Sequence, residues 1–207
     1  MRHAITLRLL LTAGGFLSGS IMFSKLIPQY LTHKDICAEN ADHNPGTANV
    51  FASCGVALGL LCLALDMAKG FLPVFVALQL LDLRNIWFAW IIAAPVLGHA
   101  LAPLNHFHGG KCIATTFGVL IGLVPVSPVY LTILAVLYIF FSTILKISPN
   151  HHRSITVFSL FGLLSIAFSI YNRNYSVAIG CCVIALTAII KHLPTQPRFL
   201  SSLHRHV

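Results

Sequence analysis

The sequence contains little charge, and its acidic residues are especially rare. Only 9% of the 207 residues are charged, and just five are Asp or Glu. Soluble domains carry about 25% charged residues, so the composition excludes an ordinary water-soluble globular domain. The chain is instead 57% hydrophobic, with a mean hydropathy of +0.86. We therefore expect an all-α fold, that of a polytopic helical membrane protein.

Three other patterns are missing. No internal repeat or low-complexity segment stands out, which argues against a transporter built from paired repeats. Residues 4–27 lack a convincing small-residue cleavage site, so they predict a retained first membrane span and not a signal peptide. The cysteines fit neither zinc nor disulfide spacing, and those in or beside apolar runs behave as small hydrophobes. They are Cys37, Cys54, Cys62, Cys112, Cys181 and Cys182.

Apolar runs predict about seven membrane spans within a single domain covering residues 1–207. A helix needs about 20 apolar residues to cross the hydrocarbon core of a bilayer. The second run is too long for one straight span, and we expect the segment 66–70 and then Pro73 to interrupt it. The predicted spans are 4–27, 50–81, 86–104, 112–124, 129–147, 155–171 and 175–190.

Basic residues are distributed unevenly between the two sides that these spans define. Lys and Arg accumulate in cytoplasmic loops, so we expect the side richer in them to be cytoplasmic. The net charge of +8 then reflects orientation and lipid-surface charge, and we expect no nucleic-acid binding. The richer side holds Lys25, Lys34, Lys111, Lys146, Arg153, Lys191, Arg198 and Arg205, and the other holds Arg2, Arg8, Arg84 and Arg173.

A polar, glycine-bearing loop between two apolar runs, residues 98–118, is the strongest local signal. Gly109-Gly110 allows left-handed or nest-like backbone whose N–H groups point at an anion. Lys111 adds a flexible point charge, and Thr115 begins the next helix, whose N-terminal dipole favours negative charge. The loop predicts a phosphate cradle at the membrane surface, with an ordinary polar hairpin as the alternative.

Two further patterns need an interpretation. Asp66 and Lys69 share a helix face at i, i+3, and ionisable groups at membrane depth are functional by default. They could serve a substrate or act as the coupling pair of a small transporter; the alternative is an ion pair that locks a kinked helix. The His-x-His pair at His106 and His108 has no close carboxylate and only Cys112 nearby, so we expect no metal.

Four ordered motifs spanning nearly the whole chain resemble those of the bacterial acyl-phosphate:glycerol-3-phosphate acyltransferases. One Gly-Gly-Lys alone is weak, whereas four motifs in order on one membrane face are specific. The motifs are Gly19-Ser20-Ile21 with Asp35-Ile36 and residues 44–49; Asp66-x-x-Lys69-Gly70; Gly98-His99, Pro103, Phe107 and Gly109-Gly110-Lys111-x-x-Ala114-Thr115; and His192 with Arg198.

This resemblance implies an integral membrane enzyme of phospholipid synthesis that transfers an acyl group from acyl phosphate to glycerol 3-phosphate, giving lysophosphatidic acid. It implies no cofactor, and as partners the two substrates and membrane lipids. The implied place is the bacterial inner membrane, with the active site on the cytoplasmic face, and we expect a monomer. Both substrates are phosphorylated, so positioning and charge stabilisation can supply most of the catalysis.

The resemblance also implies roles for individual residues. His192 would orient the acceptor or aid proton transfer, and for each assignment the alternative is helix packing or loop capping. The implied catalytic residues are Ser20, Lys111 and His192; the implied substrate- and phosphate-binding residues are Asn44, Gly46, Asn49, Lys69, Gly109, Gly110, Thr115 and Arg198; and the implied supporting residues are Asp66 and His99.

Several positions depart from the family's pattern. Cys37 stands where a cation near the phosphate is expected, Asp42 lies in a segment where the family has Gly-Ser-Gly, and Cys112 replaces a glycine. In the C-terminal motif Thr195 replaces an Asn. These changes favour a divergent branch. They leave open a catalytically altered member that binds or regulates phosphorylated lipid intermediates.

Overall fold

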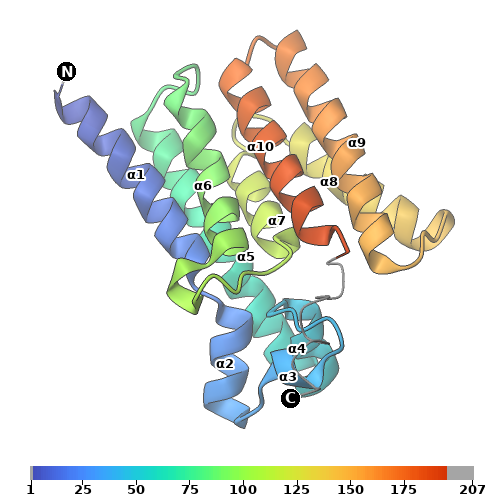
Figure 1. Ribbon diagram of the computed structural model, residues 1–207. Coiled ribbons are helices and arrows are strands. Elements are labelled where there is room, and N and C mark those ends of the chain that lie inside the picture. Colours follow the sequence, from blue (N-terminus) through green and yellow to red (C-terminus); the bar gives the residue numbers. More distant parts are fainter. Residues whose placement is uncertain (1, 195–207) are drawn as a thin grey trace, which may run out of the picture.

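The computed structural model describes residues 2–194, and these form helices with no strand among them. The expected all-α fold is therefore confirmed (Figure 1). In chain order the helices are α1 (Arg2–Ser20), α2 (Phe23–Thr32), α3 (Ile36–Glu39), α4 (Thr47–Cys54), α5 (Val56–Leu80), α6 (Trp87–Leu101), the 3-10 turn η1 (Pro103–Asn105), α7 (Ile113–Gly122), α8 (Val129–Ile139) with the π-helical turn η2 (Phe140–Ile144), α9 (Asn150–Tyr171) and α10 (Tyr175–His192).

Helices long and apolar enough to cross a membrane make up most of the described chain. Four qualify individually, namely α5, α6 continued to Asn105, α9 and α10. A fifth arises if α1 and α2, which meet at an angle of 42°, count as one broken span. The helices α7 and α8 with η2 are apolar but shorter. The chain is thus a multi-pass membrane protein, and the count of seven spans stays a prediction.

Close helix contacts hold these spans together. Helix α6 packs between α1 and α10, α10 also packs against α9, and α5 packs against α7 (Figure 1). A Cβ atom on Gly19 would overlap the backbone of Pro95, and one on Gly98 would overlap the carbonyl of Phe16. Small residues at these positions let the α1 and α6 backbones touch, as is usual between membrane helices. Gly19 of the first motif thus serves close helix packing.

The long second apolar run is divided at a different place from the one expected. The helix α5 continues through Asp66 and includes Pro73, whereas the chain breaks at Gly55, between α4 and α5. Gly55 has φ = 85°, a left-handed value that favours glycine. The expected interruption near residue 66 is therefore wrong, because the charges there are paired within the helix and leave its hydrogen-bonding pattern intact.

Candidate active site

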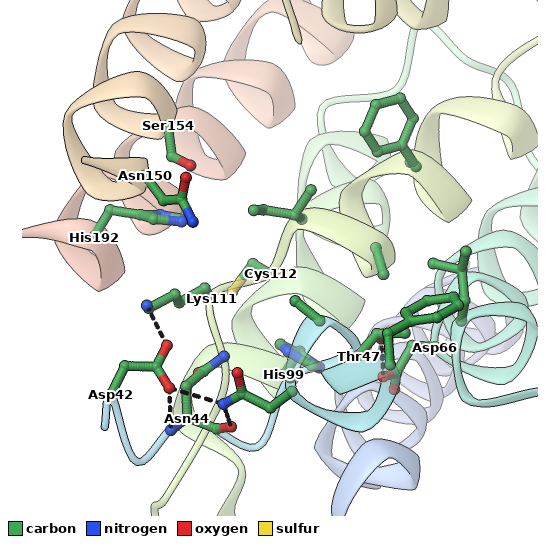
Figure 2. Close-up of a pocket in the computed structure, with 18 of the residues that line it drawn as sticks. Asp42, Asn44, Thr47, Asp66, His99, Lys111, Cys112, Asn150, Ser154 and His192 are labelled. Atoms are coloured by element: carbon green, nitrogen blue, oxygen red, sulfur yellow. Dashed lines mark hydrogen bonds and ion pairs between the residues drawn. The ribbon is translucent and has the colours of Figure 1, made fainter. Parts of the chain in front are cut away.

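A cavity of about 610 Å³ lies at the end of the helical bundle where the polar segments gather. Its wall comes from the α3–α4 loop, α4, the middle of α5, the C-terminus of α6, the loop before α7 and the first half of α7, the N-terminus of α9 and the C-terminus of α10. Residues from several of the polar motifs therefore line one cavity, and their place on one membrane face stays a prediction. Figure 2 shows Asn150, Ser154 and His192 grouped at one end of this cavity, with Asp42, Asn44, His99 and Asp66 further along.

At the mouth of the cavity, the Asp42 carboxylate accepts hydrogen bonds from three groups (Figure 2). One oxygen accepts from Asn49 Nδ2 at 2.7 Å and from the Asn44 backbone N–H at 3.2 Å, and the other pairs with Lys111 Nζ at 2.8 Å. Burial alone would raise the pKa of the Asp42 carboxyl, but the hydrogen bonds from Lys111 and Asn49 outweigh it and hold that pKa below its ordinary value. A cation, an amide and a backbone N–H therefore converge on one anion.

His192, the last residue of α10, lines the cavity. Its Nδ1 lies 2.8 Å from the Ala188 carbonyl, which accepts only if Nδ1 carries the proton. This assigns the tautomer and leaves Nε2 unprotonated in the neutral ring. Nε2 is buried and has no hydrogen-bond partner, while His192 itself is 3% exposed. In this tautomer the imidazole can accept a proton through Nε2.

The glycine-bearing loop that precedes α7 (residues 106–112) reaches the cavity through Lys111. Its two glycines, Gly109 and Gly110, instead pack against α6. Neither Gly109 nor Gly110 lines the cavity or has a positive φ, so the expected left-handed conformation is wrong. The Gly110 N–H donates to the His99 carbonyl at 3.1 Å. A Cβ on Gly109 would overlap the carbonyls of His99 and Ala100, and one on Gly110 would overlap the His99 ring. The two glycines are required for this close approach to His99, which lines the cavity.

The replaced glycine of this loop has a visible backbone consequence. Cys112 lies at φ = 67°, in the left-handed region that glycine adopts most readily. Its thiol is buried and lines the cavity, donating to the Val96 carbonyl at 3.6 Å. The local backbone therefore keeps the conformation that a glycine favours, although the side chain has changed.

Asp66 and Lys69 form a buried ion pair, with Lys69 Nζ 2.7 Å from Asp66 Oδ1. Their expected pairing is thus confirmed. Lys69 also donates to the Ile21 carbonyl at 2.5 Å, where α1 ends, and Asp66 accepts from Ser24 at 2.5 Å and from Thr47 at 3.3 Å. Asp66 lines the cavity whereas Lys69 does not. The pair joins α5 to the break between α1 and α2 and to the start of α4.

The remaining expected site residues lie in different surroundings. Ser20 is buried and donates to the Phe16 carbonyl of its own helix at 2.9 Å, away from the cavity lining. Thr115 is buried behind the cavity, with its carbonyl close to Gly70 of α5. Gly46 lines the cavity as expected. Arg198 lies outside the described residues, so its role stays a prediction.

Cys37, which replaces an expected cation, does not line the cavity. It lies in α3, where its N–H donates to Asp35 at 3.0 Å and its carbonyl lies 2.8 Å from His43 Nδ1. Burial and the nearby Asp35 raise the pKa of the Cys37 thiol, so the thiol stays protonated near neutral pH. This position therefore adds no charge to the cavity.

Sequence reasoning missed a group of polar residues at the start of α9. Asn150, His151, Arg153 and Ser154 all line the cavity. The signal was present as a polar run, Asn-His-His-Arg-Ser, directly before an apolar span. We interpreted that run only as a loop that contributes to the charge asymmetry, because no motif pointed to it.

A family model described as glycerol-3-phosphate acyltransferase matches residues 9–202. A glycerol-3-phosphate acyltransferase of Hydrogenobaculum sp. (strain Y04AAS1) is 30% identical over 195 residues, covering 92% of each chain. Another, of Streptococcus pyogenes serotype M5 (strain Manfredo), is 30% identical over 177 residues, covering 86% of this chain and 82% of that protein.

Two solved structures share the fold. Both are of PlsY (YgiH), described as an integral membrane glycerol 3-phosphate acyltransferase. The glycerol 3-phosphate form has a TM-score of 0.75 at 27% identity, covering 89% of this chain and 88% of that one. The lysophosphatidic acid form has a TM-score of 0.72 at 26% identity, covering 90% and 88%. With the matched span, the multi-pass helical fold and a cavity to whose wall all four motifs contribute residues, the chain belongs to the glycerol-3-phosphate acyltransferase family.

Proposed function

We propose that this protein transfers an acyl group from acyl phosphate to the 1-hydroxyl of glycerol 3-phosphate, giving lysophosphatidic acid for phospholipid synthesis. The observation that carries the proposal is the free Nε2 of His192 in the same cavity as Lys111. A base and a cation at one cavity are the groups that acyl transfer between two phosphorylated substrates needs.

The reaction follows from these two groups. The 1-hydroxyl oxygen attacks the carbonyl carbon of the acyl phosphate while His192 Nε2 accepts the hydroxyl proton. The new ester C–O bond forms, the bond from the carbonyl carbon to the phosphate oxygen breaks, and inorganic phosphate leaves. Lys111 stabilises the charge on a phosphate group, since a charge-assisted hydrogen bond contributes about 1.5–3 kcal/mol. Acyl phosphate is already activated, so no protein nucleophile is required.

The wall of the cavity suits an amphipathic substrate. Beside its polar end, apolar side chains line it from α4, α5 and α7, including Phe51, Leu63, Met67, Ile113 and Phe117. The phosphate head of such a substrate would bind among the polar groups, and its acyl chain would lie along these apolar side chains. This arrangement supports a lipid-bound donor or product.

The family assignments divide into two kinds under this proposal. Asn44, Gly46, Asn49, Lys111 and His192 line the cavity and would contact substrate, with His99 and Asp66 in its wall. The others act by holding those elements in place. They are Ser20, Lys69, Gly109, Gly110 and Thr115, all outside the lining. We further propose one domain, a monomer, and a cytoplasmic site in the bacterial inner membrane, supported by the excess of Lys and Arg on that side.

One observation favours a second function, in which the protein binds phosphorylated lipid intermediates without turnover. Asp42 already occupies the donors of Asn44, Asn49 and Lys111, so a phosphate must compete with a carboxylate there. A site that binds its anion weakly could regulate rather than catalyse.

Purified protein in detergent, offered acyl phosphate and glycerol 3-phosphate, separates these two functions. Acyl transfer requires formation of lysophosphatidic acid and release of inorganic phosphate in equal amounts, while acyl-thioester donors should give none. Binding of both substrates with no product would instead establish the regulatory function. Product made only from thioesters would overturn acyl phosphate as the donor.

A further inference from the structure

The fixed charges around the cavity are nearly all paired within the protein. Lys111 pairs with Asp42 at the mouth, and Asp66, deeper in the wall, pairs with Lys69 behind it. Arg153 also lines the cavity. Within the described part of the chain its guanidinium forms no ion pair, and its buried Nε has no hydrogen-bond partner. Leaving histidines aside, Arg153 is the unpaired cation of the described lining.

Arg153 lies in the first turn of α9, a helix of 22 residues. The first N–H groups of a helix have no partner within it and carry the positive end of the helix dipole. Here Asn150 and His151 begin that turn, while the His152 N–H bonds back to the Pro149 carbonyl at 3.1 Å. Asn150 and His151 both line the cavity, as does Ser154 one residue after Arg153. These features favour an anion, although a helix terminus alone does not define a site.

A second, independent feature comes from the facing helix. His192 of α10 is only 3% exposed and lines the same cavity, and its Nε2 has no hydrogen-bond partner. Figure 2 shows its ring beside Asn150 and Ser154 at this end of the cavity. A buried polar atom without a partner is costly, so a ligand with a hydrogen-bonding group is expected to meet it here.

We propose that Arg153, with Asn150 and His151 at the start of α9, forms a phosphate-binding subsite that faces His192. None of the family motifs assigned this segment. The ligand is the phosphate group of a phosphorylated substrate, and that identity rests on the proposed function. The guanidinium presents donors in a planar fork that matches phosphate, which Lys does not. Arg153 thereby supplies the cavity with the cation that Cys37 does not provide.

The subsite also explains how one cavity can hold two phosphates. Lys111 belongs to the loop before α7, and Arg153 to α9, so the two cations stand on separate elements of the wall. Two dianionic groups repel strongly at short range, and separate cations let the donor and the acceptor bind together. His192, grouped with the α9 residues, then reaches a hydroxyl on a substrate held there.

Equilibrium dialysis of the purified, detergent-solubilised protein against radiolabelled inorganic phosphate tests the subsite without requiring turnover. We expect Arg153→Gln to raise the Kd for phosphate about ten- to a hundred-fold, the equivalent of one charge-assisted hydrogen bond. Arg153→Lys should retain part of the affinity because it keeps the charge and loses the fork. Arg173→Gln is the matched control, since Arg173 is exposed beyond the other end of α9.

Each outcome decides the proposal. A Kd that is unchanged by Arg153→Gln while thermal unfolding shows a folded protein overturns it, as does a wild-type protein that binds no phosphate. If Arg153→Gln does not fold, Arg153→Lys provides the test. Wild-type affinity for phosphate in Arg153→Lys would refute recognition of phosphate by the planar guanidinium. Displacement of the label by glycerol 3-phosphate or by a long-chain acyl phosphate identifies which substrate occupies the subsite. Arg153-dependent binding in a protein without acyl transfer would refute the proposed function and retain the subsite.

Discussion

Replacing Asp42 by Asn should strengthen the binding of glycerol 3-phosphate, which is an unusual direction for a change at an active site. The Asp42 carboxylate holds Lys111 Nζ at 2.8 Å and Asn49 Nδ2 at 2.7 Å, the kinds of donor that a phosphate needs. Asparagine keeps the size of the side chain and removes its charge. Lys111 is then released for substrate.

The expected magnitude has two parts. The pair is partly exposed, with side-chain exposures of 32% for Lys111 and 42% for Asp42, and such a pair contributes about 0.2–1 kcal/mol. Repulsion between the carboxylate and a phosphate about 4 Å away adds about 1 kcal/mol per charge in a watery environment. For a doubly charged phosphate the repulsion is about 2 kcal/mol, so together about 2–3 kcal/mol opposes phosphate binding. The variant should therefore lower the KM for glycerol 3-phosphate about thirty- to 150-fold.

Steady-state kinetics at low ionic strength, with acyl phosphate saturating, gives the KM directly. The Asp42 pKa is lowered, so the carboxylate stays ionised above about pH 5 and its effect is lost only as the pH falls through that lowered pKa. The KM ratio of wild type to variant should therefore be constant from about pH 7 to pH 8, where Asp42 is ionised and the phosphate is mostly doubly charged. Asp82→Asn is the control, because Asp82 is an exposed acid in the α5–α6 turn. A KM that rises in Asp42→Asn would refute the competition and make Asp42 the residue that positions Lys111.

Three other substitutions test the rest of the site. Lys111→Ala should lower kcat/KM about ten- to a hundred-fold with little change in Tm, because its pair is partly exposed; a near-wild-type rate would contradict its role. His192→Gln should lower kcat by about 10²- to 10⁴-fold, and the binding of glycerol 3-phosphate should be measured separately. A higher KM with an unchanged kcat would exclude proton transfer by His192. Lys69→Ala leaves Asp66 buried without its cation, so thermal unfolding should show a loss of about 3–5 kcal/mol; an unchanged Tm would refute the buried pair.

Local spacing predicted the parts of this structure that depend on neighbours in sequence. The pairing of Asp66 with Lys69 follows from i, i+3 geometry on one helix. The predicted spans put the polar segments on one side of the membrane, and residues from several of these segments line one cavity. The family motifs named Asn44 and His192, which line that cavity as well.

Contacts between distant segments could not be read from the sequence. Asp42 and Lys111 are 69 positions apart and meet only because the α3–α4 loop folds over the cavity. The sequence predicted that Gly110 binds phosphate, because glycine can adopt a positive φ. In the structure a glycine is required there because a Cβ atom would overlap the His99 ring. Arg153 was counted as a surface charge, because a polar run before a span has the same pattern whether it faces water or a cavity.

The buried ion pair of α5 has a consequence for how the protein enters the membrane. Because Asp66 and Lys69 lie one turn apart on the same helix, their charges can neutralise each other within α5, without a contact from another span. We expect α5 to insert as an independent segment in spite of two ionisable residues. The contacts from Ser24 and Thr47 to Asp66, and from Lys69 to Ile21, can form only later, when the neighbouring segments assemble. The same pair that lets α5 enter the bilayer then holds the bent N-terminal segment against it.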